Sequence, residues 1–158
     1  MKNPLNIKSI LFAGALVVFC GCGVNKSTDT LDRAARELVP SEGKALVYIM
    51  RPSAMGGLLA FKVFIDDEYY AYTTGKRFLY AFLDPGTHKI MTKSENKDEI
   101  SIVFEEGKTY YFEQKVQLGI MKARNKIERI PEAEGRKKLS KCKLSKVQPA
   151  IAATATQK

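Results

Sequence analysis

Side chains capable of acid–base or nucleophilic chemistry are few in this chain of 158 residues, which has one histidine and three cysteines. Such catalysis usually needs a histidine or a thiolate with an orienting partner. His88 and Cys142 are therefore the candidates for a hydrolase or thiol redox site. His88 directly follows a Pro-Gly turn, where a histidine more commonly hydrogen-bonds to backbone. Cys142 lies near the end of an expected helix, where a partly buried apolar cysteine is commoner. We predict no catalytic residues.

Metal and cofactor chemistry has little support either. A zinc site needs three or four convergent cysteine or histidine ligands. Only His88 and Cys142 would remain unmodified, because we expect Cys20 to be removed on export and Cys22 to be acylated. The acids Asp66, Asp67 and Glu68 could hold calcium only weakly, because successive strand residues point to opposite faces. We interpret them as solvated turn residues. Gly56-Gly57 forms a flexible connection and no phosphate-binding loop, so no metal and no cofactor are predicted.

The first residues have the layout of a secretory signal peptide. Lys2 and Lys8 precede an uncharged run over residues 10–19, and small and polar residues follow. A transmembrane helix that stays in the protein is the alternative, but it needs about 20 apolar residues to cross a bilayer. The run is roughly half that length. We therefore predict that residues 1–21 are removed on export.

The cleavage position resembles the lipobox of bacterial lipoproteins, in which a small residue precedes a cysteine that becomes acylated after cleavage. Gly21 before Cys22 fits this pattern, whereas Cys20 follows the bulky Phe19. We predict that acylated Cys22 attaches the protein to a membrane. Gly23 stands where lipoproteins kept in the inner membrane often carry aspartate. The resemblance thus implies the periplasmic face of the outer membrane of a Gram-negative bacterium.

Positive charge is concentrated toward the carboxyl end. Loss of Lys2 and Lys8 lowers the formal net charge from +9 to +7, and residues 122–158 hold eleven basic and three acidic side chains. Such a field attracts anions. On an exported protein these would be anionic envelope polymers or lipids, and nucleic acid is not an expected partner. The lysines expected to make this contact lie on a basic amphipathic helix: Lys137, Lys138, Lys141 and Lys143. The alternative is that these lysines only form a solvated helix face.

The pattern of apolar residues predicts one mainly β domain. Residues 22–43 are a tether with a short helix over Thr30–Leu38, and residues 44–146 contain about seven short strand segments before the basic helix that Pro131 opens. The first segment, over residues 45–51, is apolar on both faces, as in a buried strand, and ends at Arg51-Pro52 because proline cannot continue a ladder. The later segments mostly alternate, and Asp66-Asp67-Glu68 forms the turn of a hairpin. Strands at this spacing, separated by turns, predict an antiparallel β-sandwich, immunoglobulin-like or transthyretin-like. After Gly119 the pattern turns helical. Residues 147–158 lack large core side chains beyond Val147 and Ile151 and are predicted to be a disordered tail.

Tyrosines supply the remaining indication of a binding surface. If alternation holds, Tyr70 and Tyr111 face outward, where they could stack on a sugar or hold an extended peptide. Cross-strand pairing that only stabilises the sheet is the alternative.

The chain contains an ordered set of short motifs: Val47-Tyr48-Ile49-Met50-Arg51-Pro52, Val63-Phe64-Ile65-Asp66, Pro85-Gly86-Thr87-His88, Gly107-Lys108-Thr109-Tyr110-Tyr111-Phe112, and Gly135 with Leu139. Together they resemble the bacterial lipoproteins grouped as domain of unknown function 2846, over about Lys44 to Cys142. The resemblance implies a small sandwich module and a lipid anchor, and no reaction or catalytic residue comes with it. The chain departs at Asp67, where the family usually has glycine.

Two functions follow from these observations. The preferred one is a membrane-anchored, non-enzymatic envelope lipoprotein that binds a partner. The alternative is an envelope enzyme that uses His88 or Cys142.

Overall fold

The computed structural model describes residues 26–119, 123–147 and 149. The predicted signal peptide, the acylated Cys22 and, apart from Val147 and Pro149, the predicted tail over residues 147–158 lie outside the described residues. The described chain forms two helices and nine strands: α1 (Lys26–Arg36), β1 (Ala45–Arg51), β2 (Phe61–Ile65), β3 (Glu68–Thr73), β4 (Arg77–Leu83), β5 (Gly86–Lys93), β6 (Lys97–Phe104), β7 (Thr109–Gln117), β8 (Arg124–Ile130), α2 (Glu132–Leu139) and β9 (Lys143–Leu144).

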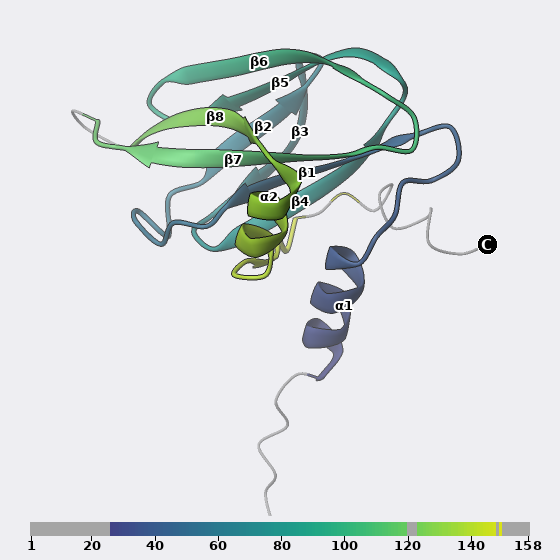
Figure 1. The fold of residues 1–158 in the computed structure, drawn as a ribbon. Coiled ribbons are helices and arrows are strands. Elements are labelled where there is room, and N and C mark those ends of the chain that lie inside the picture. Colours follow the sequence, from purple (N-terminus) through teal and green to yellow (C-terminus); the bar gives the residue numbers. More distant parts are fainter. Residues whose placement is uncertain (1–25, 120–122, 148, 150–158) are drawn as a thin grey trace, which may run out of the picture.

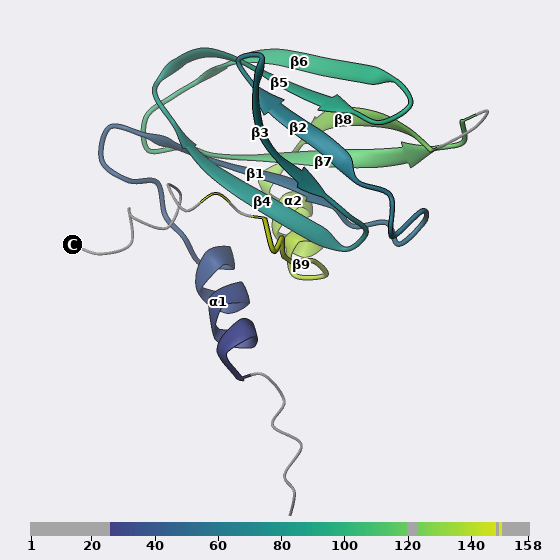
Figure 2. The same cartoon turned by 180° about the vertical axis from the view of Figure 1, so that it is seen from behind.

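The strands form two sheets packed face to face, with the helices below the larger one (Figures 1 and 2). The five-stranded sheet has the order β8-β7-β1-β4-β9, and the four-stranded sheet has the order β3-β2-β5-β6. The mainly β prediction is confirmed. The predicted seven-stranded antiparallel sandwich is wrong, because β1 pairs parallel with β7 and β4 pairs parallel with β9 in a mixed sheet.

Strand β1 is the centre of the fold, and all seven of its residues are buried. Val47 and Ile49 face the four-stranded sheet and join the inter-sheet core. Leu46 and Tyr48 face the helices and join a second core with Leu139. An uninterrupted apolar strand is expected where both faces of a sheet are covered, and this prediction is confirmed.

The helical layer is held by contacts between the two ends of the domain. Helix α2 lies directly on the Tyr111 ring, because a Cβ at Gly135 would approach the Tyr111 Cγ to 2.3 Å. In α1, the Arg36 Nη2 donates to the Cys142 carbonyl at 2.7 Å, and the buried Asp32 carboxylate accepts from the Leu144 amide at 2.9 Å. Helix α1 covers Lys26–Arg36, so it starts and ends earlier than the helix predicted over Thr30–Leu38.

Strand β8 was expected to be helical, and this prediction is wrong. It pairs antiparallel with β7 along its whole length, and its buried positions alternate at Asn125 and Ile127. Asn125 is polar but fully paired, since Thr92 donates to its side-chain oxygen and its amide nitrogen donates to Ser94. A buried amide whose polar atoms have hydrogen-bond partners is tolerated in a core. Because asparagine is polar, its presence at a core position interrupts the apolar alternation that would have predicted this strand.

The predicted hairpin between β2 and β3 is confirmed. Asp66 and Asp67 are its two turn residues and have φ values of 51° and 69°. Positive φ at both positions identifies a type I′ turn, which normally favours asparagine or glycine. Aspartate adopts this conformation more readily than most residues, so the chain keeps the turn without a glycine at Asp67.

In the part of the chain that the structure describes, no helix has the length and apolar character needed to cross a bilayer.

Candidate functional site

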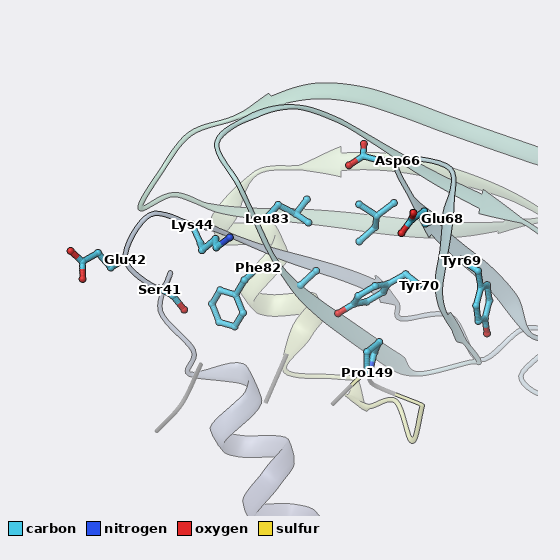
Figure 3. Close-up of a pocket in the computed structure, with 12 residues that line it drawn as sticks. Ser41, Glu42, Lys44, Asp66, Glu68, Tyr69, Tyr70, Phe82, Leu83 and Pro149 are labelled. Carbon is cyan, nitrogen blue, oxygen red and sulfur yellow. The ribbon is translucent and has the colours of Figure 1, made fainter. Parts of the chain in front are cut away.

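A concave site lies where the sandwich stays open between β3 and β4. Strand β3 is an edge of the four-stranded sheet. Strand β4 pairs with β9 only at Arg77 and Phe78. From Leu79 to Leu83 this side of β4 therefore has no strand partner within the described ranges. A groove of about 790 Å³ runs between the two edges (Figure 3).

The groove combines an aromatic wall with an acidic rim. Tyr69 is its most exposed aromatic residue, at 55%, and packs edge to face on Phe64 with ring centroids 5.7 Å apart. The Lys44 ammonium lies in the lining but contacts the Asp84 carboxylate at 2.7 Å. The other lining residues are Ser41, Glu42, Ile65, Asp66, Glu68, Tyr70, Ala81, Phe82, Leu83 and Pro149.

Tyr70 does not face outward as expected. It is half-buried, packs on the inter-sheet core, and its hydroxyl donates to the Tyr80 carbonyl at 2.5 Å. Val63 pairs with Ala71 and Phe64 with Tyr69, so Tyr70 is an additional residue at a register irregularity. A bulge changes which side each later side chain takes, which explains the error. Tyr70 bridges the groove, and Tyr69 is left exposed.

Tyr111 was also expected to be exposed, and this is corrected by its exposure of only 2%. Its ring stacks on Tyr48 with centroids 5.4 Å apart and an interplanar angle of 15°. Burial raises the pKa of Tyr111 above its ordinary value. The alternation placed Tyr111 on the correct face, but α2 covers that face through Gly135. Tyr111 is therefore a core residue.

The four candidate lysines differ in their surroundings. Only Lys137 and Lys138 lie on α2, which ends at Leu139, so the predicted helical position is wrong for Lys141 and for Lys143, which lies in β9. Lys137, Lys141 and Lys143 are exposed, and among the described residues none of the three forms an ion pair. The Lys138 ammonium instead contacts the Glu113 carboxylate at 2.5 Å and the Glu134 carboxylate at 2.7 Å. Burial opposes its charge, but these two hydrogen bonds raise the pKa of Lys138. Lys138 thus joins α2 to β7, and three lysines remain available to an anion.

His88 has both ring nitrogens engaged. Nδ1 lies 2.5 Å from the Asp66 carboxylate and Nε2 lies 2.9 Å from the Asp84 carbonyl oxygen. The other Asp66 carboxylate oxygen accepts the Lys89 amide at 2.9 Å. Partial burial acts to raise the pKa of Asp66, but the hydrogen bonds from His88 and Lys89 lower it overall. The predicted hydrogen bond from His88 to backbone is confirmed, and it joins two turns.

Cys142 lies in the core between the helices and the five-stranded sheet. It is fully buried, whereas a partly buried apolar cysteine was predicted, and burial raises the pKa of its thiol to about 12. A reactive cysteine is normally a partly exposed thiolate of lowered pKa. His88 lies on β5 of the other sheet, so the two candidate catalytic residues occupy different layers.

The acidic turn is engaged within the fold. The Asp67 carboxylate contacts the Lys89 ammonium at 2.7 Å, and Asp66 is bound to His88. Across residues 26–119, 123–147 and 149, no three histidine, cysteine, aspartate or glutamate side chains are grouped to hold a metal ion.

Sequence reasoning did not identify Tyr69 or Phe82 as groove residues. The signal for Tyr69 was its position directly after the turn acids in the Tyr69-Tyr70 pair, but the alternation assigned the exposed position to the wrong tyrosine. Phe82 lies in the part of β4 that has no strand partner on the groove side among the described residues. Which strands pair is not visible in the local sequence pattern.

Residues 41–126 match the family described as protein of unknown function DUF2846. The chain belongs to this family. An uncharacterized protein of Haemophilus influenzae is 29% identical over 138 residues, which cover 87% of this chain and 82% of the relative. The family match of this DUF2846 protein extends from the connection before β1 into β8, and it includes both strands beside the groove.

Proposed function

We propose that this DUF2846 protein is an exported envelope lipoprotein, held to the periplasmic face of the outer membrane by acylated Cys22, that works as a non-enzymatic binding module. The observation that carries the binding role is the open groove between β3 and β4. The anchor is supported by the signal-peptide layout and by Gly21 before Cys22. Three residues separate Cys22 from α1, so the anchor holds the domain close to the membrane.

The occupant that suits the groove is an extended peptide segment of a partner protein. A strand edge that has no neighbouring strand offers main-chain donors and acceptors to an added strand, although the Tyr80 carbonyl already accepts the Tyr70 hydroxyl. Tyr69 and Phe82 offer flat apolar surfaces to alternate side chains of such a strand. The acidic rim at Glu42 and Glu68 favours a segment that carries basic residues.

The proposal assigns no reaction to the protein. The His88 ring is occupied at both nitrogens, and the Cys142 thiol is buried with a pKa raised to about 12. A general base must reach the proton that it removes, and neither group is presented to the groove.

The exposed lysines of the α2 region extend the proposed role to anionic envelope polymers. Lys137, Lys141 and Lys143 stand free of ion pairs with the described residues. Replacing all three with glutamine should weaken binding to isolated sacculi or anionic vesicles, most at low salt because salt screens exposed charges. Lys138→Gln should weaken binding less, since Glu113 and Glu134 already balance that charge. Binding that stays equal across salt concentrations would remove this part of the proposal.

The anchor is tested by fractionation and mass spectrometry of protein from its native host. Cys22→Ser should release the protein from the membrane fraction, while Cys20→Ser should leave it attached. An unmodified amino terminus in the cytosol would overturn the export proposal.

The groove is tested by site-specific photocrosslinking in intact cells. A benzoylphenylalanine at Tyr69 should capture a partner, and the added substitution Phe82→Ala should reduce the yield. Val103 is the matched control, since it is 62% exposed on β6, away from the groove. Equal products from positions 69 and 103 would show that the groove is not the binding site.

A further inference from the structure

The two ends of the sandwich have opposite chemistry. At the end that holds the groove, polar contacts join the connections: Lys44 with Asp84, Glu106 with the Gly43 amide, and His88 with Asp66. At the other end the connections expose large apolar side chains. These are Met55 at 58%, Leu58 at 98%, Leu59 at 40% and Leu118 at 89% exposure.

The apolar side chains belong to one surface. Loop 52–60 approaches Ala123, the residue before β8, because a Cβ at Gly56 would lie 3.8 Å from the Ala123 Cβ. The Gly75 amide donates to the Gly57 carbonyl at 2.9 Å and adds a third connection. Both views show loop 52–60 at the same end of the sheets as the carboxyl end of β7 (Figures 1 and 2). We call this surface the apolar end: Met55, Leu58, Leu59 and Leu118, with Lys62 and Lys93 beside them.

Loop 52–60 is held in place by the buried side chain of Arg51. Its guanidinium donates to the carbonyls of Leu59 at 2.6 Å, Met55 at 2.7 Å and Gly56 at 2.8 Å. It also lies over the Phe61 ring at 4.0 Å. Leu58 is therefore presented to solvent by a loop of defined conformation. Holding a leucine almost fully exposed forgoes its burial energy, which favours a role in contact with another surface.

Two lysines border a hollow of about 320 Å³ at this end, together with Leu59 and Ala123. Lys62 and Lys93 are direct cross-strand partners in β2 and β5. Both are exposed, and among the described residues neither forms an ion pair. Like charges placed directly opposite each other are unfavourable, and a shared anion relieves them. One acid, Glu95, also lines the hollow.

We propose that the apolar end docks on an anionic lipid surface, with Leu58 and Leu118 entering the interfacial layer and Lys62 and Lys93 contacting headgroup phosphates. The leucines project from loops, so a folded protein would need a matching hollow for each one. A lipid interface accepts projecting apolar groups without one, and basic residues beside them add attraction to anionic headgroups. The contact is independent of the Cys22 acyl group and of the groove.

The first test uses tryptophan as a depth probe, because the chain contains no tryptophan. Leu58→Trp, Leu118→Trp and the control Val103→Trp are made in a chain that starts at residue 22 and carries Cys22→Ser. This chain keeps every described residue and lacks the acyl group and the apolar leader. With phosphatidylglycerol and phosphatidylethanolamine vesicles, positions 58 and 118 should show a blue shift and quenching by brominated acyl chains. The same response at position 103, or none at 58 and 118, would overturn the proposal.

The second test measures affinity for the same vesicles by flotation. Leu58→Ser and Leu118→Ser should each weaken binding about tenfold, and Lys62→Gln and Lys93→Gln about fivefold each at low salt. The control Lys108→Gln removes an exposed charge at the end of the sandwich that holds the groove, and it should change this affinity less. All these positions are exposed, and circular dichroism verifies that the variants fold. Unchanged affinity of the leucine variants, or a dimer in solution that Leu58→Ser dissociates, would assign the surface to another role.

Discussion

Arg51→Met should reveal how strongly one buried cation stabilises the end of the sandwich. The substitution keeps a long side chain under loop 52–60 but removes the donors that reach the carbonyls of Met55, Gly56 and Leu59. It also removes the guanidinium from the face of the Phe61 ring. The loop carbonyls must then find water, and the easiest way is for the loop to open.

The magnitude follows from the number of contacts. A hydrogen bond to a charged group contributes about 1.5–3 kcal/mol net, and a cation–π contact adds about 0.5–2 kcal/mol. Burial of the guanidinium opposes these gains, and its Nε has no hydrogen-bond partner in the described structure. Opening of the loop lets the three carbonyls reach water and recovers part of the lost hydrogen-bond energy. We expect the free energy of unfolding to fall by about 3 kcal/mol or more.

The control is Arg77→Met, because Arg77 is the direct cross-strand partner of Arg51. Arg77 is half-buried and donates to one carbonyl, that of Leu144, at 3.0 Å, so its loss should reach only about 1 kcal/mol. Urea unfolding measures both variants, and limited proteolysis with thermolysin should cut the Leu58-Leu59 region faster in Arg51→Met alone. Equal stability losses and equal cleavage would refute the anchoring role of Arg51.

Three further outcomes are expected. Gly135→Ala should destabilise the fold by about 1–3 kcal/mol through overpacking on Tyr111, and adding Tyr111→Leu should recover part of the loss in thermal unfolding. Hydrogen bonds from two lysines lower the pKa of Glu128 to about 2 from an ordinary value near 4.5. Its stabilisation is therefore present above about pH 4.5 and lost as pH falls toward 2, so the unfolding curves of wild type and Glu128→Gln should converge there. Because burial raises the pKa of Cys142 to about 12, its thiol should resist Ellman's reagent at pH 8 until urea unfolds the protein, measured in the Cys22→Ser chain from residue 22. Immediate labelling would contradict that burial.

Local patterns of apolar residues were sufficient to locate seven of the strands, because each strand is bounded by turns and has at least one buried face. The uninterrupted apolar run of β1 indicated burial on both sides, and the structure has all seven residues buried. Alternation does not say what covers a face. Tyr111 was placed on the correct side of β7, but the cover from α2 depends on a close approach at Gly135, 24 residues later in the chain.

Pairing between distant strands was beyond the reach of the sequence pattern. The parallel pair of β1 and β7 joins Leu46 to Thr109, and no local period encodes that choice. Strand β8 was missed because Asn125 occupies a core position, where the partners that satisfy it come from β5 and the turn that follows. The two-residue β9 is too short for any periodicity.

For the candidate site, too, the predictions that depended on local sequence were correct and those that depended on three-dimensional arrangement were wrong. His88 was expected to bond to backbone because of the adjacent turn, and it does. The exposed groove tyrosine was misassigned by one residue, since the bulge opposite Val63 and Phe64 reverses the side that Tyr70 takes. Arg51 was interpreted only as the end of a strand. Its role as an anchor depends on where three carbonyls of the following loop come to lie.

The Arg51 anchor also separates two explanations of the apolar end. If the defined loop conformation matters for lipid contact, Arg51→Met should weaken vesicle binding although Leu58 and Leu118 remain in the chain. If apolar composition alone is sufficient, a loosened loop should bind as well as the wild type. The loop ends at Phe61, which lies under the guanidinium, and the strand that begins there carries Lys62 opposite Lys93. Loosening the loop therefore disturbs the spacing between the leucine and the lysine pair. This coupling is why we expect affinity and stability to fall together in Arg51→Met, and stability alone to fall in Gly135→Ala.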